Sequence, residues 1–598
     1  ISTLDHAMGN SLYCAAEKGH VNILQYMLDN YANVNFEYSD EKRNISRETP
    51  LIAAAKNGLT ETVRVLINHD DKNYKVKNYS LFYLDNELLI LAVKLIRLRA
   101  PERLKADINM TDSKGYTPLM LAAKNNHIDV VRILLIHSAD VDKSLGYTAL
   151  MLASKYGYSK VADILIKESS DIDKSNYLGF TALLLASRYG HNEIAELLIN
   201  NSADPNTRTH TGLTSLYFSS KYGHVEIAKL LVNHLADPNL SSYSFGQTPL
   251  IWASKYGYIE ISELLISNSA DVHKKTYDGG HTALSCASQT GQLKIVEILL
   301  KNHADVNDHR HNGYTPLISA SRYNHSNVVE LLINNFAIVN KASHGDGSNA
   351  IIWAAKNGNI KIAELLLNNS ADVNKTDHKR NSPIIWATYV NSTEMVGLLL
   401  NNGADVNAVN HNGQSALIIA SRQGHFKLVE LLVKNLANVN TTDHKGYTPI
   451  FWASYVNSTE MVELLLNHGA DVNSIYYGKG LTPLMVASIR GHAKNVQVMI
   501  NYSADVNKRC YNGTTALMRA SINGHFDVVE LLIKHSDVNA IDHDGNSALL
   551  LASMYGSFKI VELLLNNSAD VNMANHKGYT PIFLASNVNS TGMVELLL

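Results

Sequence analysis

Apolar and polar residues alternate along this chain in short blocks that recur with a fixed spacing. Residues 444–473, HKGYTPIFWASYVNSTEMVELLLNHGADVN, show the pattern once. Thr448-Pro449 predicts the start of a first helix, because a hydroxyl can cap free backbone N–H groups and proline tolerates the first helical position. Asn457 can adopt the left-handed conformation that ends this helix. A second, amphipathic helix is expected from Ser458 to Gly469, before an extended loop leads into the next block.

The block recurs along the whole chain. The first helix of each copy is expected to start at a Thr, Ser or Asn, namely Asn10, Thr49, Thr117, Thr148, Thr181, Thr214, Thr248, Thr282, Thr315, Asn349, Ser382, Ser415, Thr448, Thr482, Thr515, Ser547 and Thr580. A weak copy near Glu87 brings the number of blocks to eighteen. From Thr117 onward the starts lie 31 to 34 residues apart, mostly 33. A period of this length is typical of a solenoid, in which stacked helix pairs bury one continuous core.

One position of the block predicts a specific backbone geometry. Nine residues after the start stands Gly or Asn in every block except the copy at Glu87, as at Gly190, Gly424 and Asn457. These two residue types adopt the left-handed conformation most cheaply. The sequence therefore predicts the same turn between the two helices of each pair.

The blocks resemble the ankyrin repeat. The family's Thr-Pro-Leu stands at 117–119 and 482–484, its Gly-His at 190–191 and 424–425, and its Ala-Asp-Val-Asn ending at 371–374 and 470–473. The resemblance implies an all-α solenoid of helix-turn-helix units joined by β-hairpin-like loops, with a role in protein binding. The family's His after Thr-Pro-Leu is missing from all copies and is replaced by residues such as Met120 and Ile251. We therefore expect stacking to rely more on apolar burial.

The spacing divides the chain into three parts. Residues 1–69 form N-terminal repeats, in which a charged insertion at 37–48 lengthens one hairpin. Residues 70–105 form a divergent repeat or insertion and a possible hinge, because Pro101 stands where a second helix should run and costs about 3 kcal/mol there. Residues 106–598 form a regular array that ends inside its last repeat, in three leucines. A solenoid needs a polar cap, so we expect this sequence to be part of a longer protein.

Composition narrows the possible functions. The formal net charge of −3 argues against a general nucleic-acid binder, and no apolar run approaches the length of a membrane span. These residues show no signal-peptide pattern and the three cysteines lie far apart, so we expect an intracellular, cytoplasmic location. Cys14 and Cys286 occupy the repeat position of the tryptophans, and we expect both to be small core residues.

All four tryptophans stand four residues after a helix start, at Trp252, Trp353, Trp386 and Trp452. They could form an aromatic binding ladder or pack in the core. We favour the core, because the same position elsewhere is occupied by leucines such as Leu121 and Leu185.

A stripe of basic and aromatic residues is the candidate partner-binding surface. Seven and eight residues after the start stand the pairs Lys155-Tyr156, Arg188-Tyr189, Lys221-Tyr222, Lys255-Tyr256 and Arg322-Tyr323. Just before the start stand Tyr116, Tyr147, Phe180 and Tyr314. In the ankyrin repeats that these blocks resemble, the positions at the helix end face the concave groove, and the position before the helix start corresponds to the contact site on the hairpin. Tyr and Arg are enriched in protein interfaces. The alternative is purely structural, since a cation in the last turn of a helix is favoured by the helix dipole.

Histidines recur at the hairpin tips, as at His378, His411 and His444. Equivalent atoms of adjacent repeats are expected about 10 Å apart, too far to share a zinc ion. We therefore expect polar turn residues in solvent.

The chain contains no Walker A loop, G-x-S-x-G, H-E-x-x-H or paired C-x-x-C motif. We predict a non-enzymatic scaffold that binds partner proteins, with no cofactor, no metal and no small-molecule substrate. The alternative is that the repeats form the targeting or elastic region of a larger effector, toxin or channel whose activity lies outside these residues.

Overall fold

The computed structural model describes residues 2–30, 32–40, 45–69, 106–144, 146–168, 170–588 and 590–598. These residues form 34 helices and one two-stranded sheet. The helices follow one another as pairs, which confirms the predicted all-α solenoid. The chain divides into two compact units, unit 1 (residues 1–287 and 294–305) and unit 2 (residues 288–293 and 306–598).

Unit 1 contains the N-terminal pairs and the only strands of the described residues. Its elements are α1 (Ser2–Lys18), α2 (Val21–Asp29), β1 (Tyr38–Asp40), β2 (Ile45–Glu48), α3 (Pro50–Lys56), α4 (Thr60–Asn68), α6 (Pro118–Lys124), α7 (Ile128–Ile136), α8 (Ala149–Tyr156), α9 (Ser159–Lys167), α10 (Ala182–Tyr189), α11 (Asn192–Asn200), α12 (Ser215–Tyr222), α13 (Val225–Asn233), α14 (Pro249–Tyr256) and α15 (Ile259–Ser267). Helices α16 (Ala283–Thr290) and α17 (Leu293–Lys301) contain residues of both units.

Unit 2 continues the same pattern. Its helices are α18 (Pro316–Arg322), α19 (Ser326–Asn334), α20 (Ala350–Asn357), α21 (Ile360–Asn368), α22 (Pro383–Tyr389), α23 (Thr393–Asn401), α24 (Ala416–Gln423), α25 (Phe426–Lys434), α26 (Pro449–Tyr455), α27 (Thr459–Asn467), α28 (Pro483–Arg490), α29 (Ala493–Asn501), α30 (Ala516–Ile522), α31 (Phe526–Ile533), α32 (Ala548–Met554), α33 (Phe558–Asn566), α34 (Pro581–Asn587) and α35 (Thr591–Leu597).

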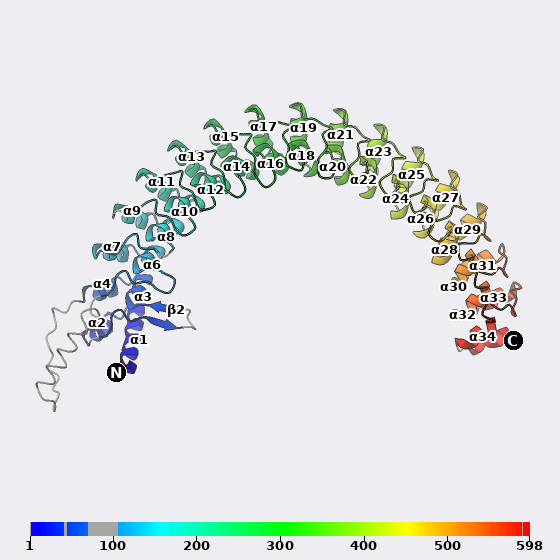
Figure 1. Ribbon diagram of the computed structural model, residues 1–598, viewed down its shortest axis with the longest axis horizontal. Coiled ribbons are helices and arrows are strands. Elements are labelled where there is room, and N and C mark those ends of the chain that lie inside the picture. The colour runs from blue at the N-terminus through cyan, green and yellow to red at the C-terminus, as the bar shows by residue number, and fades with distance from the viewer. Residues whose placement is uncertain are drawn as a thin grey trace, which may run out of the picture. The chain divides into compact units, whose positions relative to one another are not determined.

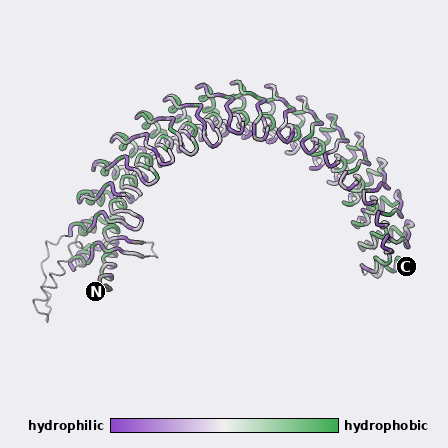
Figure 2. The backbone as a smooth tube through the Cα atoms, viewed as in Figure 1, coloured by the Kyte–Doolittle hydropathy of each residue, from purple (hydrophilic) through white to green (hydrophobic). Residues whose placement is uncertain are grey.

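Within each unit the helices form two rows. The first helices of successive pairs, such as α8, α10 and α12, contact one another, and so do the second helices, such as α9, α11 and α13 (Figure 1). Each first helix also contacts its own second helix. Apolar residues lie mostly on the helices and polar residues on the loops between pairs (Figure 2).

The two rows bury different amounts of each helix. In α10 every residue from 182 to 187 is buried, so this first helix is enclosed on all sides except at its C-terminal end. In α11 only Ile194, Ala195, Leu198 and Ile199 are buried, and the opposite face is solvent-exposed. Helices of seven to nine residues are not stable alone. The contacts with neighbouring pairs must therefore supply most of the stability.

The predicted turn between the helices of a pair is confirmed. All described residues nine positions after a start have a positive φ, from Gly190 (80°) to Asn457 (61°), while Asn589 lies outside the described residues. The predicted helix cap is also present, because the Thr448 hydroxyl accepts a hydrogen bond from the Phe451 backbone N–H at 3.3 Å.

Polar contacts also join neighbouring pairs, although the family's usual histidine is absent. The Nε2 of His191 donates to the Lys155 carbonyl at 3.1 Å, and that of His525 donates to the Ile489 carbonyl at 2.9 Å. In the loops, Asn206 Oδ1 accepts from the backbone N–H of Asp237 in the next repeat at 2.8 Å. Histidine directly after the turn and asparagine at the repeat end therefore supplement the apolar burial.

The insertion at 37–48 forms the hairpin of β1 and β2, with Tyr38 opposite Glu48 and Asp40 opposite Ile45. This observation agrees with the predicted long hairpin. The predicted hinge at 70–105 and the copy at Glu87 lie outside the described residues. The helix pairs on either side, α3–α4 and α6–α7, pack directly against each other.

Each hairpin tip of unit 2 rests on the tip before it. The backbone N–H of His444 donates to the Asn412 carbonyl at 3.0 Å, and its ring lies against Gly413. A Cβ atom at Gly413 (φ 74°) would approach the His444 Cδ2 within 2.6 Å. Gly469 (φ 85°), at the end of α27, would meet no heavy atom within 4 Å.

We therefore expect Gly413→Ala to be more destabilising than Gly469→Ala. The second change adds only the strain of a left-handed alanine, about 1 kcal/mol, whereas the first adds a clash between repeats. Urea unfolding followed by far-UV circular dichroism measures the difference. Adding His444→Ala to Gly413→Ala should recover most of the extra loss, and equal losses for the two glycine variants would contradict this account.

Candidate functional site

A row of cations runs along the first helices of unit 1. Lys124, Lys155, Arg188, Lys221 and Lys255 occupy the last turns of α6, α8, α10, α12 and α14. Each is favoured there locally, because the carbonyl end of a helix carries partial negative charge. Since successive first helices are parallel neighbours, these charges recur once per repeat on the same side of unit 1.

Aromatic rings lie between these cations. Lys155 Nζ is 5.2 Å from the centre of the Tyr147 ring. The Arg188 guanidinium lies 5.7 Å from Phe180 in its own repeat and 5.6 Å from Phe218 in the next. Cation–π contacts at exposed sites contribute about 0.5–1 kcal/mol, and those of Arg188 and Lys221 reach a ring of the following repeat.

Tyrosines at the helix ends complete what we call the unit-1 stripe. Its members are the five cations, Trp252, Tyr116, Tyr147, Phe180, Tyr156, Tyr189, Tyr222 and Tyr256. The last four are 41%, 44%, 41% and 48% exposed. Tyr222 stacks on Phe218 at 6.4 Å and Tyr256 on Trp252 at 5.5 Å. These tyrosines are half-exposed and fixed in place, as a contact surface requires.

The charges of the unit-1 stripe lack counter-charges. Within the part of the chain that the structure describes, no carboxylate forms an ion pair with any of its five cations. Burial lowers the pKa of Lys221 below its usual value, and the charges of Arg188 and Lys255 lower it further. Burial raises the pKa of the neighbouring Tyr217 to about 12, so this phenol is neutral near pH 7 and adds no negative charge.

In unit 2 the predicted residues Arg322 and Tyr323 lie in the same kind of arrangement. The Arg322 guanidinium is 5.5 Å from the Tyr323 ring and 4.5 Å from the Trp353 ring, and Tyr323 is 44% exposed. Tyr314 differs from the expectation, because it is only 7% exposed. Its hydroxyl lies 3.5 Å from the Asp346 carboxylate, so it supports the hairpin rather than offering a contact surface.

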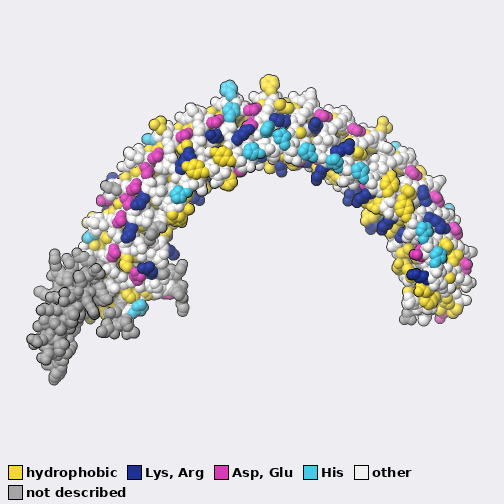
Figure 3. Space-filling model, in the orientation of Figure 1, with side chains coloured by type: hydrophobic (Ala, Val, Ile, Leu, Met, Phe, Trp, Pro, Cys, Tyr) yellow, Lys and Arg dark blue, Asp and Glu magenta, His cyan; other side chains and the backbone are white. Residues whose placement is uncertain are grey.

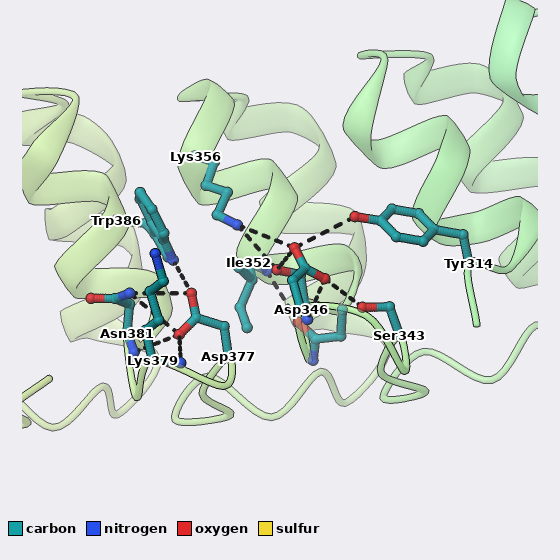
Figure 4. A network of polar contacts seen from close by, with 11 residues as sticks. Tyr314, Ser343, Asp346, Ile352, Lys356, Asp377, Lys379, Asn381 and Trp386 are labelled. Atoms are coloured by element: carbon teal, nitrogen blue, oxygen red, sulfur yellow. Dashed lines mark hydrogen bonds and ion pairs between the residues drawn. The ribbon is translucent and has the colours of Figure 1, made fainter. Parts of the chain in front are cut away.

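A carboxylate of the chain compensates one cation of unit 2 (Figure 4). Asp346 Oδ2 lies 3.8 Å from Lys356 Nζ and accepts from the Ser348 hydroxyl at 2.8 Å. Burial alone would raise the pKa of Asp346, but the hydroxyls of Ser343 and Ser348 and the charge of Lys356 hold it below its usual value. This carboxylate is therefore ionised well below neutral pH and fixed beside the cation.

The expectation that the tryptophans are core residues holds only for Trp252, which is 8% exposed and packs with Leu184 and Tyr217. Trp353, Trp386 and Trp452 are half-buried, and Lys356 Nζ lies 4.4 Å from the rings of both Trp353 and Trp386. A leucine at this position stays in the core, whereas an indole extends to the surface beside the cation of the preceding repeat. The sequence did not distinguish these cases, because each tryptophan, Trp252 included, has a Lys or Arg 30 or 31 residues before it, at Lys221, Arg322, Lys356 and Arg422.

The cysteines do not behave alike. Cys286 is buried, as expected, but Cys14 is exposed, and all three cysteines are free thiols. The expectation for Cys14 is therefore wrong.

The histidines at the hairpin tips are exposed, and histidine side chains gather along this face of unit 2 (Figure 3). Among the described residues no group of three or more His, Cys, Asp or Glu side chains could hold a metal ion. No described helix is both long and apolar enough to cross a membrane. A hollow of about 140 Å³ lies between Tyr116, Tyr147 and Tyr177, which is small for a ligand pocket.

Comparisons with known proteins agree with the architecture. A family model described as ankyrin repeats (3 copies) matches residues 4–78, 89–176, 168–242, 236–309, 273–343, 302–377, 335–410, 384–476, 475–542 and 532–598. Ankyrin repeat domain-containing protein 49 of Bos taurus is 43% identical over 60 residues, which are 9% of this chain and 25% of that protein. Alpha-latrocrustotoxin-Lt1a of Latrodectus tredecimguttatus is 29% identical over 127 residues, which are 20% of this chain and 8% of the toxin.

Two histidines beside the first helices predict a pH dependence of stability. Burial lowers the pKa of His224 and of His425 below their usual value. As the pH falls through about 6.5, the unfolded chain takes up protons at these sites before the folded chain does. The free energy of unfolding should therefore decrease on acidification.

We expect the urea midpoint of His224→Gln/His425→Gln to fall less between pH 7 and pH 5.5 than that of the parent protein. The comparison at each pH cancels the contribution of the other histidines. An equal decrease of the urea midpoint in both proteins would show that these two imidazoles do not contribute to the pH dependence of stability.

Proposed function

Because the chain belongs to the ankyrin-repeat family, we propose that it is a non-enzymatic scaffold that binds partner proteins along its first helices and hairpin tips. The observation that carries this proposal is the unit-1 stripe, in which four half-exposed tyrosines lie beside cations in successive repeats. Its contacts are Tyr116, Tyr147, Lys155, Tyr156, Phe180, Arg188, Tyr189, Lys221, Tyr222, Lys255 and Tyr256, with Arg322 and Tyr323 in unit 2 and Tyr314 in support.

The chemistry of these side chains suits a protein interface. Tyrosine offers a large contact area and loses little entropy on binding, because it has only two side-chain torsions. The rings are already fixed by stacking, as between Trp252 and Tyr256, which lowers the cost of binding further. One shallow contact per repeat can add up along the stripe to a useful affinity.

Other ligand classes have less support. The net charge of −3 does not favour general nucleic-acid binding, and the hollow at Tyr116 is smaller than the usual small-molecule pocket. We therefore propose no cofactor, metal or small-molecule substrate. Free thiols are consistent with an intracellular, cytoplasmic location.

The similarity to a toxin favours a second candidate. In this alternative, the repeats form the targeting or elastic region of a larger effector, and the activity lies outside these residues. The coding sequence on either side of this chain distinguishes the candidates, since a catalytic or membrane-active segment there would support the second.

We expect Tyr189→Ala/Tyr222→Ala/Tyr256→Ala to abolish capture of partner proteins, because it removes three half-exposed contacts from successive repeats. Quantitative mass spectrometry of proteins retained on the immobilised chain measures this loss. Far-UV circular dichroism should be unchanged.

The matched control is Ile136→Ala/Leu235→Ala/Ile259→Ala, which removes three exposed apolar side chains (77%, 86% and 40% exposed) in or next to the second helices of unit 1. Its captured proteins should match those of the parent. Unchanged capture by the tyrosine variant would remove the stripe from the proposal.

A further inference from the structure

We infer that the unit-1 stripe binds an acidic, extended polypeptide segment whose carboxylates recur at the spacing of the repeats. This inference rests on the proposed scaffold function and names the chemistry of the partner. It follows from three observations: cations without counter-charges, the position from which two other repeats supply a counter-charge, and the spacing of the helices.

The first observation is the run of unpaired charge. Five successive repeats place a cation on the same side of unit 1, and none of the five forms an ion pair with a described residue. Lys221 and Lys255 both lie against the Trp252 ring, at 4.4 and 5.0 Å from its centre. The ring orients these cations but carries no net charge, so their mutual repulsion is not neutralised.

The second observation is that two repeats outside the stripe supply their own carboxylate. Lys56, at the same repeat position, pairs with Glu48 at 2.9 Å, and Lys356 lies 3.8 Å from Asp346. Both acids stand within three residues before the cap of the first helix. The same three positions before Thr117, Thr148, Thr181, Thr214 and Thr248 contain no carboxylate.

The comparison shows where a ligand carboxylate would lie. In unit 2 the Asp346 side chain reaches from the hairpin to the cation at the end of α20 (Figure 4). In the unit-1 stripe no carboxylate of a described residue pairs with these cations, so a carboxylate of a partner would occupy this place. Charge complementarity therefore calls for acidic side chains, one for each repeat.

The third observation concerns spacing. Packed helices lie about 8–10 Å apart, and three residues of a polyproline II helix advance about 9 Å and return to the same face. An acidic residue at every third position would therefore meet successive cations. Intervening prolines would lie against the half-exposed Tyr156, Tyr189, Tyr222 and Tyr256, because aromatic surfaces recognise this conformation.

A nucleic acid fits less well. Single strands bind without sequence preference by stacking bases on free aromatic faces. In the unit-1 stripe Lys or Arg side chains already lie over Tyr147, Phe180 and Trp252. The phosphates would find cations, but bases could stack only on the four half-exposed tyrosines, each of which already has a Lys or Arg side chain near its ring.

The test uses a fluorescein-labelled peptide of five Glu-Pro-Ala repeats, titrated with the whole chain and followed by fluorescence anisotropy. We expect saturable binding that weakens with added salt. The variant Lys155→Gln/Arg188→Gln/Lys221→Gln/Lys255→Gln should bind at least about tenfold more weakly, since four modest charge contacts are lost. Replacing the three lysines by arginine should preserve binding, which shows that loss of charge is responsible rather than misfolding.

The matched control is Arg132→Gln/Lys160→Gln/Lys167→Gln/Lys229→Gln, which makes the same change in net charge on the second helices of unit 1. It should bind within about twofold of the parent. A peptide of the same composition with its five glutamates adjacent should bind more weakly than the spaced peptide.

Equal losses in the two quadruple variants, or equal affinity for the two peptides, would overturn the inference in favour of general charge attraction. Tighter binding of a 15-nucleotide oligo-dT would overturn it in favour of nucleic acid, and no binding at millimolar peptide would overturn it outright. The two proposals can also fail separately. If Tyr189→Ala/Tyr222→Ala/Tyr256→Ala no longer captures partner proteins, but Lys155→Gln/Arg188→Gln/Lys221→Gln/Lys255→Gln still does, the proposed scaffold function is supported and the inference of an acidic ligand is wrong.

Discussion

Each helix pair of this protein is buried only by the pairs beside it. The helices are mostly seven to nine residues long, too short to persist alone, and a first helix such as α10 is buried at every residue from 182 to 187. Stability therefore depends on repeating one geometry without error. The left-handed residue after each first helix serves this requirement, because it sends the second helix back along the first by the same path in all the described pairs.

The same constraint determines which surface is available for binding. Since first helices are mostly enclosed, their ends, the hairpins and the half-buried Trp353, Trp386 and Trp452 are what reaches solvent. Helix ends favour cations, and a ring lies beside them either from the loop before the same helix, as Tyr147 beside Lys155, or from the next first helix, as Trp252 beside Lys221. A row of cations and rings is thus a consequence of stacking, and its chemistry depends on which side chains occupy three positions of the repeat.

The periodic part of this structure could be predicted from the sequence, because one geometry was specified many times. The turn at Gly190 or Asn457 and the cap at Thr448 are local, and each residue type has a direct physical reason. The second left-handed position in the repeat was not predicted. It is occupied by Leu235, Phe336 and Leu436 in three repeats, residue types that give no sign of this conformation.

The candidate surface was only partly predictable, because its contacts cross from one repeat to the next. Trp353 resembles a core residue when compared with Leu121 at the same repeat position, and its exposure depends on the size of the indole and on Arg322 in the preceding repeat. Tyr314 occupies the same repeat position as Tyr147, yet it is buried, and its hydroxyl donates a hydrogen bond to Asp346 in the following hairpin. A single aligned position does not contain this information.

The two units show that charge and counter-charge are separable in this architecture. The cation belongs to the last turn of a helix, where stacking and the helix dipole both favour it. The carboxylate belongs to a hairpin, where a change of one side chain leaves the stacked helices intact. Asp346 therefore closes a position beside Lys356 that remains open at Lys155, Arg188 and Lys221. Stacking fixes the spacing of such positions, and the hairpin residue decides, repeat by repeat, whether the chain or a partner fills them.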